Sequence, residues 1–308
     1  MKRRLLFHRD FLCYSGGHGK VWHYFRHADA HPGWSSWVHF SPASILPGNP
    51  WLAVPERIRE RWEPEQADAL LLGGTDWGMY PADDPGKPVV NLVQHVRHAD
   101  PGSQLRSFLP RRAVRICVTR QVADAILATG EVNGPVHVIE AALDLPLAQP
   151  PEDTQRRGIF IDALKQPGLG AALHERLRAS GRDSFLSTDR MPRSEYLDRL
   201  RAAAISVVLP NEREGFYLPA LEAMALGSPV VVPDCVGNRV YLEPDANALV
   251  PGWHPDEFVA AVLRLEGDPS LAGRLVQAGR ATVRRFGMER EREAFHAILD
   301  DLEGQWRA

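Results

Sequence analysis

Two glutamates, Glu214 and Glu222, flank a Gly-Phe-Tyr-Leu-Pro segment at residues 215–219 and stand eight positions apart. A helix that begins at this segment exposes unpaired N–H groups and a partial positive charge, which suit an anion such as a diphosphate. Gly215 has no Cβ and lets the backbone approach a ligand, and Pro219 is tolerated in the first helical turn. Glu214 could accept hydrogen bonds from sugar hydroxyls. Glu222, about two turns later, could bind two ribose hydroxyls. An ordinary amphipathic helix with solvated glutamates is the alternative.

The wider string over residues 209–243 adds further fixed positions to this pair. After Glu222 come Ala-Met-Ala, then Gly227, Pro229 and the apolar run 230–232. The string resembles the nucleotide-sugar site of retaining glycosyltransferases with the GT-B fold, in the family called glycosyl transferases group 1. An ordinary helix does not require Gly215, Pro219 and Gly227 together.

The resemblance implies roles for the residues of this loop. It makes Glu214 a catalytic residue and assigns donor binding to Glu222, Gly215, Phe216, Tyr217 and Leu218. Tyr217 stands where the family often has glycine, which narrows the expected donor pocket.

Lys165 is the only lysine after residue 87, in a chain that otherwise uses arginine as its cation. It follows the apolar segment GIFIDAL. The family places a lysine there to bind the donor diphosphate, and a compact ammonium suits a phosphate. A surface lysine without a role is the alternative. The family's arginine five residues earlier is replaced by Phe160, so Arg157 and Arg213 are the nearest candidates for a second phosphate cation.

Composition is ordinary for a globular protein. The 308 residues can form two α/β domains with their own cores, and the net charge of -3 implies no bulk attraction to nucleic acid. Three widely spaced cysteines indicate neither a disulfide framework nor a zinc site. The N-terminal segment is expected to be a first strand, not a signal peptide. No apolar run approaches the roughly 20 residues of a membrane span, so a cytoplasmic location is expected.

Alternating strand and helix patterns predict two parallel sheets. The strands are expected at 4–8, 35–40, 69–72, 88–95, 114–118, 136–139, 158–162, 184–187, 204–209, 229–233 and 247–250. The helices are expected at 19–29, 54–62, 119–129, 168–180, 193–203, 217–226, 255–266, 270–285 and 288–306.

The resemblance implies an α/β GT-B architecture, with two Rossmann-like domains facing a cleft. Residues 1–146 form the expected acceptor-side domain, and the proline-rich segment 147–156 is its linker. Residues 157–287 form the donor domain, and the helix in 288–308 is expected to cross back to the first domain.

Ligands of open α/β sheets bind beyond the carboxyl ends of the strands, which singles out three places in the first half. Gly16 and Gly17 lie in a glycine-rich loop expected to approach the donor. The resemblance implies a catalytic histidine at His95, at the end of the strand VVNLVQH. Acceptor contacts are expected from Asp76, His18 and His98, and His98 is also the alternative to His95.

Two further patterns have plain explanations as alternatives. His23, His27 and His31 recur every four residues and would share a helix face, but Pro32 ends that helix and the resembled family needs no metal. The basic segment 105–115 could touch an anionic membrane surface weakly, with a solvated basic face as the default.

These observations predict a retaining, metal-independent glycosyltransferase that moves a sugar from a nucleoside diphosphate to a hydroxyl acceptor and needs no cofactor. A non-catalytic nucleotide-sugar-binding GT-B scaffold is the second hypothesis. A dinucleotide-dependent dehydrogenase is a third, which rests only on the early glycine loop. The base, the sugar and the acceptor do not follow from the sequence.

Overall fold

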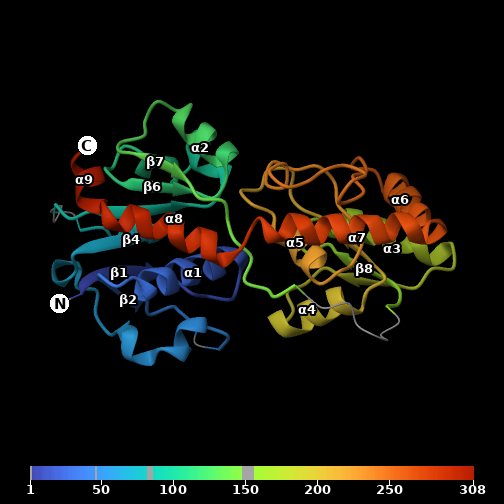
Figure 1. The fold of residues 1–308 in the computed structure, drawn as a ribbon, viewed down its shortest axis with the longest axis horizontal. Helices are drawn as coiled ribbons and strands as arrows, with labels where there is room; N and C mark the ends of the chain where they lie inside the picture. Colours follow the sequence, from blue (N-terminus) through green and yellow to red (C-terminus); the bar gives the residue numbers. More distant parts are fainter. Residues whose placement is uncertain (1, 46, 82–85, 148–155) are drawn as a thin grey trace. The chain divides into compact units, whose positions relative to one another are not determined.

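The computed structural model describes residues 2–45, 47–81, 86–147 and 156–308 (Figure 1). The chain forms two compact units, one of residues 1–141 with 288–308 and the other of residues 142–287. The first boundary falls before Leu143, because this residue pairs with Gly287 and its N–H bonds to the carbonyl of Phe286 at 2.9 Å. Most of the expected linker, residues 148–155, lies outside the described residues.

The first unit contains a parallel sheet of seven strands in the order β3-β2-β1-β4-β5-β6-β7. Its central strands are apolar and buried on both faces, as parallel sheets require. The chain builds outward from β1 to β3 and then returns to place β4 on the other side of β1. The strands are β1 (Arg3–Arg9), β2 (Trp34–Phe40), β3 (Ile58–Arg59), β4 (Ala69–Gly73), β5 (Val89–Val93), β6 (Val114–Cys117) and β7 (Val136–Val138).

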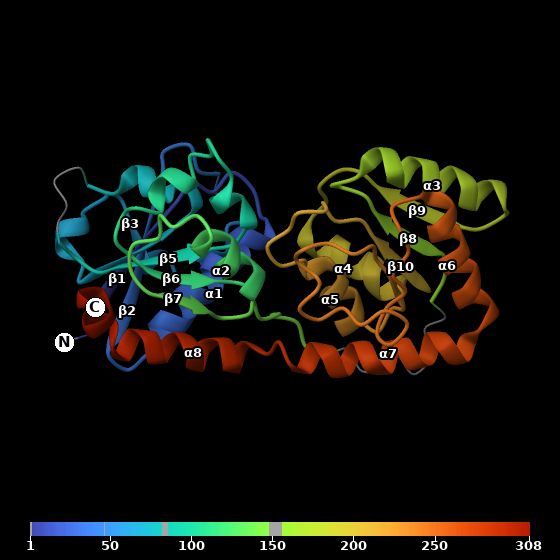
Figure 2. The ribbon, with the colours of Figure 1, turned by 90° about the horizontal axis from the view of Figure 1, so that it is seen from above.

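The helices of this unit include two from the C-terminus of the chain. Figures 1 and 2 both show α8 beside α1, and these two helices are in contact. The return of the C-terminal segment to the first unit follows from this packing. The helices are α1 (Gly16–Ala30), α2 (Arg120–Leu127), α8 (Met288–Asp300) and α9 (Leu302–Arg307).

The histidine row of α1 explains how α8 is held. Buried Glu291 accepts hydrogen bonds from the Lys20 ammonium at 2.7 and 3.0 Å, and His27 lies 3.1 Å from the same carboxylate. Burial alone would raise the pKa of Glu291, but Lys20 and His27 lower it to about 2. His31 pairs with Asp300 at 3.0 Å. The row therefore binds α8, and no group of three metal-ligating side chains occurs among the described residues.

The helix expected at 54–62 is wrong. This segment contains a 3₁₀ turn at Pro55–Arg57 and the short strand β3, whose Ile58 pairs with Val38 of β2. Pro50 and Pro55 each begin a separate short turn, because a proline inside a continuous helix removes a hydrogen bond and clashes with the preceding turn.

The second unit contains four parallel strands in the order β11-β10-β8-β9. The strands are β8 (Ile159–Asp162), β9 (Ser184–Ser187), β10 (Ile205–Val208) and β11 (Val230–Val231). The strand expected at 247–250 is wrong: Leu249 forms only an isolated bridge to Val231. The chain passes from β8 to β9 on one side and then to β10 on the other, so its direction of winding switches between β8 and β10.

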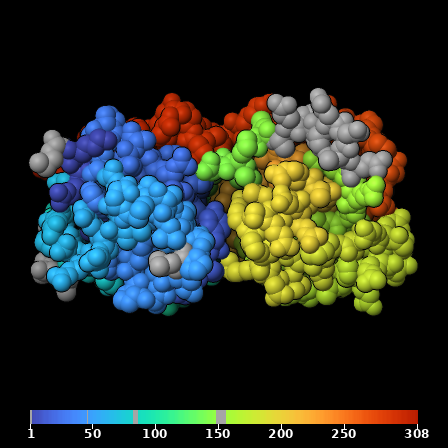
Figure 3. All heavy atoms as spheres, turned by 90° about the horizontal axis from the view of Figure 1, so that it is seen from below, coloured from blue at the N-terminus to red at the C-terminus, as the bar shows by residue number. Residues whose placement is uncertain are grey.

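Among its described residues the second unit has five helices, and apolar side chains on both faces of its sheet form two buried clusters. The helices are α3 (Pro167–Ala179), α4 (Arg193–Ala202), α5 (Leu218–Ala225), α6 (Pro255–Gly267) and α7 (Pro269–Arg284). Helix α5 contacts both α4 and α7, and α3 contacts α6. Figure 3 shows the α4 region, in yellow, exposed on one face of this unit.

Candidate active site

The loop between β10 and α5 brings two predicted residues into contact. The buried Glu214 side chain accepts a hydrogen bond at Oε1 from Lys165 Nζ at 2.6 Å and another from the Asn211 N–H at 3.0 Å. Lys165 follows β8 and Glu214 follows β10, which are neighbouring strands. The pair therefore lies beyond the carboxyl end of the sheet at its switch of winding, where open α/β sheets bind ligands.

The N-terminus of α5 is open to an anion. In this fully described helix, no side chain caps the N-terminus and no acidic residue lies in the first turn. Pro219 has no N–H to leave unpaired, so the orphan donors of the first turn are those of Leu218 and Ala220. The Lys165 ammonium lies 5.2 Å from the centre of the Tyr217 ring, at the N-cap of the same helix. A lysine and a helix N-terminus thus converge on one place.

Tyr217 and Phe216 support the loop through their side chains. Tyr217 is fully buried, and its backbone carbonyl accepts a hydrogen bond from the Tyr241 hydroxyl at 2.5 Å. The Phe216 ring packs 5.6 Å from the rings of both Tyr241 and Phe286. These aromatic contacts fix the loop that presents Glu214.

A second loop, residues 233–238, was missed in the sequence and lies against the first. A Cβ on Gly237 would come within 2.7 Å of the Glu214 Cβ, so only glycine fits this approach. The Gly237 carbonyl accepts from the Tyr217 N–H at 3.0 Å. Asn238, fully buried, ties the loop together through the Cys235 N–H and the Pro233 carbonyl. The Gly-Asn pair after a strand was the signal that could have found this support.

Glu222 is buried and forms an ion pair with Arg193. Its Oε1 lies 2.5 Å from Nη2 of Arg193, the first residue of α4. Sequence reasoning missed Arg193. The available signal was its position, because a cation at a helix N-terminus opposes the helix dipole and needs another reason to be there.

Asp162 ends β8 beside these groups and was also missed. Its Oδ2 accepts a hydrogen bond from the Tyr196 hydroxyl at 3.0 Å. Burial raises the pKa of Asp162, and Glu222 adds to the rise, whereas the bond from Tyr196 opposes it. A carboxylate at the end of the apolar strand IFID was the available signal.

The two candidates for a second phosphate cation occupy different positions. Arg157 precedes β8, at the opposite end of the strand from Lys165, and its N–H bonds to the Ala202 carbonyl at 3.0 Å. This position does not favour Arg157 as a phosphate ligand beside Lys165. Arg213 is exposed in the loop that carries Glu214.

In the first unit, predicted residues meet where β1 and β4 end. Asp76 Oδ2 accepts from Arg9 Nη1 at 2.5 Å and from the Gly73 N–H at 3.1 Å. Arg9 Nη2 in turn lies 2.9 Å from His18 Nδ1. Burial raises the pKa of Asp76 to about 6 against the opposing effect of Arg9. The Asp76 carboxylate thus holds Arg9 and, through it, His18.

The glycine loop and the two histidines after β5 lie at the same edge of this sheet. Ser15 caps α1 by accepting from the His18 N–H at 3.3 Å, and the Gly17 carbonyl accepts from Gln94 Nε2 at 3.2 Å. His95 is half-buried and accepts at Nδ1 from the Arg97 N–H. Its neighbour His98 is buried, and burial lowers its pKa to about 4. Burial favours a structural role for His98 over the acceptor contact expected for it.

The arginines of the basic segment 105–115 each have a partner. Arg106 pairs with Glu131 at 2.7 Å. Arg111 and Arg112 donate to the carbonyls of Trp77 and Trp306, and the fully buried Arg115 donates to several carbonyls of its own region. Arg115 is therefore lost to a basic face, whereas Arg111 remains exposed and Arg106 and Arg112 are half-buried.

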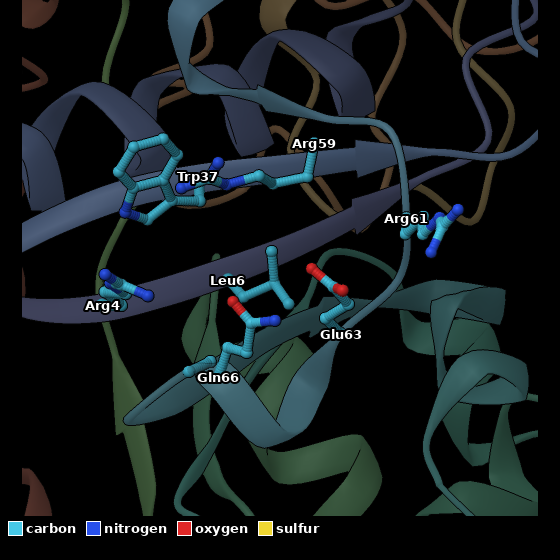
Figure 4. A pocket seen from close by; sticks show the side chains of 8 residues that line it. Arg4, Leu6, Trp37, Arg59, Arg61, Glu63 and Gln66 are labelled. Atoms are coloured by element: carbon cyan, nitrogen blue, oxygen red, sulfur yellow. The ribbon is translucent and has the colours of Figure 1, made fainter.

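A hollow on the first sheet lies apart from every predicted residue (Figure 4). It spans β1, β2 and β3, and the guanidinium of Arg59 stacks 3.6 Å from the centre of the Trp37 ring. The hollow is lined by Arg4, Leu6, Trp37, Arg59, Arg61, Glu63, Gln66 and Ala67. Ring stacking and sheet packing account for it without a ligand.

Comparison with known proteins agrees with this geometry. Residues 166–268 match the model of the family glycosyl transferases group 1. The chain is 30% identical to a D-inositol 3-phosphate glycosyltransferase of Kribbella flavida over 73% of its own length and 54% of that protein. It is 37% identical to one of Xylanimonas cellulosilytica over 68% and 51%. The chain thus spans about half the length of these relatives.

Solved structures give the fold. HepE of Anabaena, in complex with UDP and glucose, superposes with a TM-score of 0.76 over 97% of this chain and 100% of that one, at 14% identity. Sucrose-phosphate synthase of Thermosynechococcus elongatus gives 0.70 over 98% and 100%, at 16% identity. The fold is therefore GT-B, built from two Rossmann-like units. The family model matches residues 166–268, which hold Glu214 and Glu222 and begin directly after Lys165, and through this segment the chain belongs to the glycosyl transferases group 1 family.

Proposed function

We propose that this chain is a retaining glycosyltransferase that moves a sugar from a nucleoside diphosphate to a hydroxyl acceptor without a metal ion. The observation that carries the proposal is the Lys165–Glu214 ion pair of 2.6 Å beside the uncapped N-terminus of α5. A cation, a helix N-terminus and a sugar-binding carboxylate at one strand edge suit a diphosphate joined to a sugar.

Each group of the second unit receives a role. Lys165 and the orphan N–H groups of α5 stabilise the diphosphate as negative charge develops on it. Glu214 accepts hydrogen bonds from the sugar, and Glu222 accepts them from the ribose. Gly215 lets the backbone approach the donor.

In the first unit the candidates are the groups at the carboxyl edge of its sheet. We assign His95 to the donor sugar near its reacting carbon, and the backbone of Gly16 and Gly17 to close approach of a substrate. His18, held through Arg9 by Asp76, is the side chain of this edge assigned to the acceptor.

The proposed reaction balances without a cofactor. The bond between the anomeric carbon and the diphosphate oxygen breaks, and a bond from that carbon to the acceptor oxygen forms on the same face. The acceptor proton passes to the departing diphosphate. NMR of the product tests this step: we expect the α configuration of the donor to be kept. A β product from an α donor would overturn the retaining mechanism.

The first test is binding. HepE was solved with UDP and glucose, so UDP-sugars come first in a thermal-shift screen that also includes GDP, ADP and their sugars. A ligand that binds only the native state raises the melting temperature by mass action. If no nucleoside diphosphate raises it, the proposed function is wrong.

A non-catalytic nucleotide-sugar binder is the second candidate, favoured by Phe160 at the position of the family's arginine. Donor hydrolysis separates the two. Turnover above background that disappears in Lys165→Ala supports the enzyme, whereas binding without turnover supports the scaffold.

We also propose a cytoplasmic location. Among the described residues the three cysteines are free thiols, with Cys13 exposed, which fits a reducing compartment. No helix in the described part of the chain is long and apolar enough to cross a bilayer. A weak peripheral membrane contact would use exposed cations such as Arg111 of the segment 105–115.

A further inference from the structure

The arginine at the start of α4 stands at a carboxylate that the proposed function needs. Arg193 Nη2 lies 2.5 Å from Glu222 Oε1. The Glu222 side chain is almost fully buried, whereas one third of the Arg193 side chain is exposed. Within the described residues the hydrogen bonding of Glu222 ends on Oε1, so Oε2 keeps its lone pairs for a ligand.

Arg193 orients the buried carboxylate of Glu222. Its guanidinium bonds to Oε1 at 2.5 Å and so restricts the rotation of the carboxylate group. With Oε1 held, the lone pairs of Oε2 point in a set direction, as recognition of two neighbouring hydroxyls requires. Arg193 therefore holds Glu222 in the orientation that binds a diol.

Arg193 is itself held by a rigid element. One turn later on α4, the Tyr196 hydroxyl bonds to Asp162 Oδ2 at the end of β8, at 3.0 Å. The guanidinium carbon of Arg193 lies 5.8 Å from the centre of the Tyr196 ring. The first turn of α4 is thus anchored on the strand that precedes Lys165, and a guanidinium has a planar set of donors that fixes the direction of its partner.

We infer that Arg193 is a positioning residue that holds the Glu222 carboxylate in one orientation, so that its second oxygen, Oε2, recognises the ribose hydroxyls of the nucleoside diphosphate. The inference rests on the proposed function. It assigns to Arg193 the discrimination between ribose and deoxyribose, without direct contact to the reacting atoms.

The test is the ratio of dissociation constants for UDP and its 2′-deoxy and 3′-deoxy forms, measured by calorimetry. If GDP or ADP binds the wild type more tightly, the same forms of that nucleotide are used. The wild type should prefer the ribonucleotide by roughly ten- to a hundredfold, as expected for loss of a hydrogen bond to a charged group. Glu222→Gln should reduce the preference to a few-fold. Arg193→Ala should do the same, and Arg193→Lys should restore part of it.

A matched control is Arg199→Ala, because Arg199 lies on the same helix and pairs with the exposed Glu195. It should leave the ratio unchanged. A merely structural role for Arg193 would weaken ribo and deoxy forms equally. An unchanged ratio in Arg193→Ala, in a protein that still binds UDP, overturns the inference and leaves the proposed function intact.

The double variant Arg193→Ala/Glu222→Gln keeps the test usable if Arg193→Ala alone fails to fold, because it leaves no buried charge unpaired. If the double variant has the same ratio of dissociation constants as Glu222→Gln, Arg193 acts through Glu222, as we infer. A further fall in that ratio overturns the inference. If the wild type binds no nucleoside diphosphate, the proposed function fails and this inference fails with it.

Discussion

Buried carboxylates in the two units hold their cations in different ways. In the first unit, the side chains of Lys20 and Glu291 are 3% and 1% exposed. In the second unit, Glu214 is 8% exposed but its partner Lys165 is 35% exposed. Glu222 and Arg193 repeat this arrangement, at 5% and 33%. We call the Lys20–Glu291 pair closed, because both side chains are buried. We call the Lys165–Glu214 and Arg193–Glu222 pairs open, because in each the cation is about one third exposed.

We propose that the difference separates a structural ion pair from the proposed donor site. The Lys20 ammonium bonds to both oxygens of Glu291, and His27 adds a third contact. Among the described residues, Lys165 donates one hydrogen bond, to Glu214, of the three that an ammonium can make. A closed pair satisfies its own groups, whereas an open pair leaves donors that a phosphate can use.

The ion pair of Arg9 with Asp76 lies between these cases, with side chains 11% and 5% exposed. Arg9 also contacts His18 at 2.9 Å. Asp76 is therefore a support for the sheet edge, and the expectation that its carboxylate contacts the acceptor directly is not favoured by these bonds.

The largest effect is expected from breaking the closed pair of Lys20 and Glu291. Glu291→Ala removes the carboxylate that pairs with the buried Lys20 ammonium and should lower the free energy of unfolding by about 3–5 kcal/mol. Seven of the eight tryptophans lie in the first unit, with Trp253 the exception, so tryptophan fluorescence in urea reports this loss. Glu289→Ala, an exposed glutamate of the same helix, is the control.

The same pair predicts a pH dependence. The pKa of Glu291 falls from 4.5 to about 2 on folding, so its contribution is present above pH 4.5 and is lost as the pH falls toward 2. Wild type should lose stability over that range more steeply than Glu291→Ala. Equal slopes, or a large loss of nucleotide affinity in the variant, would break the distinction between closed and open pairs.

The next largest effect is expected from breaking the open pair of Lys165 and Glu214. Lys165→Ala should lower kcat about 10²–10³-fold, because the charge acts as the diphosphate departs. Its loss of stability should be smaller than that of Glu291→Ala, since Glu214 keeps the bond from the Asn211 N–H. Arg182→Ala, which removes a half-exposed ion pair with Glu266 in the same unit, should leave kcat unchanged.

A smaller effect should separate the two glutamates. In the proposed function Glu214 binds the sugar, whose charge changes most, so Glu214→Ala should mainly lower kcat. Glu222 is proposed to bind the unreactive ribose, so Glu222→Ala should mainly raise the donor KM. Each change should be roughly ten- to a hundredfold. Steady-state kinetics with Glu212→Ala as the exposed control check the split. A Glu212 effect as large as that of Glu214 would show that the loop register is wrong.

The second unit was the more predictable because its signals are local. The string from Glu214 to Pro229 fixes a loop, a helix and a strand in one stretch, and the edge rule for parallel sheets brings Lys165 beside it. Arg193 and Gly237 were not predicted, because their roles depend on contacts between segments that are distant in sequence. No spacing rule links the start of α4 to the second turn of α5.

The first unit was predicted less well because its signals are weak taken alone. The apolar strands predicted at 69–72 and 88–95 were clear, but the segment 54–62 had helical composition and instead forms a 3₁₀ turn and the short strand β3. The histidine row had the period of a helix face and no indication of its partner. That partner, Glu291, lies more than 250 residues away, which periodicity in one segment cannot reveal.

The smallest effect is expected from removing metal ions. In the proposed site, Lys165 and the N-terminus of α5 supply the positive charge that a divalent cation would otherwise place on the diphosphate. Transfer measured in excess EDTA should therefore change by less than about twofold, whereas an enzyme that needs a metal-bound diphosphate loses its Lewis acid entirely. Activity that vanishes in EDTA and returns with Mg²⁺ or Mn²⁺ would mean that the open cation of Lys165 is insufficient. The distinction between open and closed pairs would then describe burial alone, without a functional consequence.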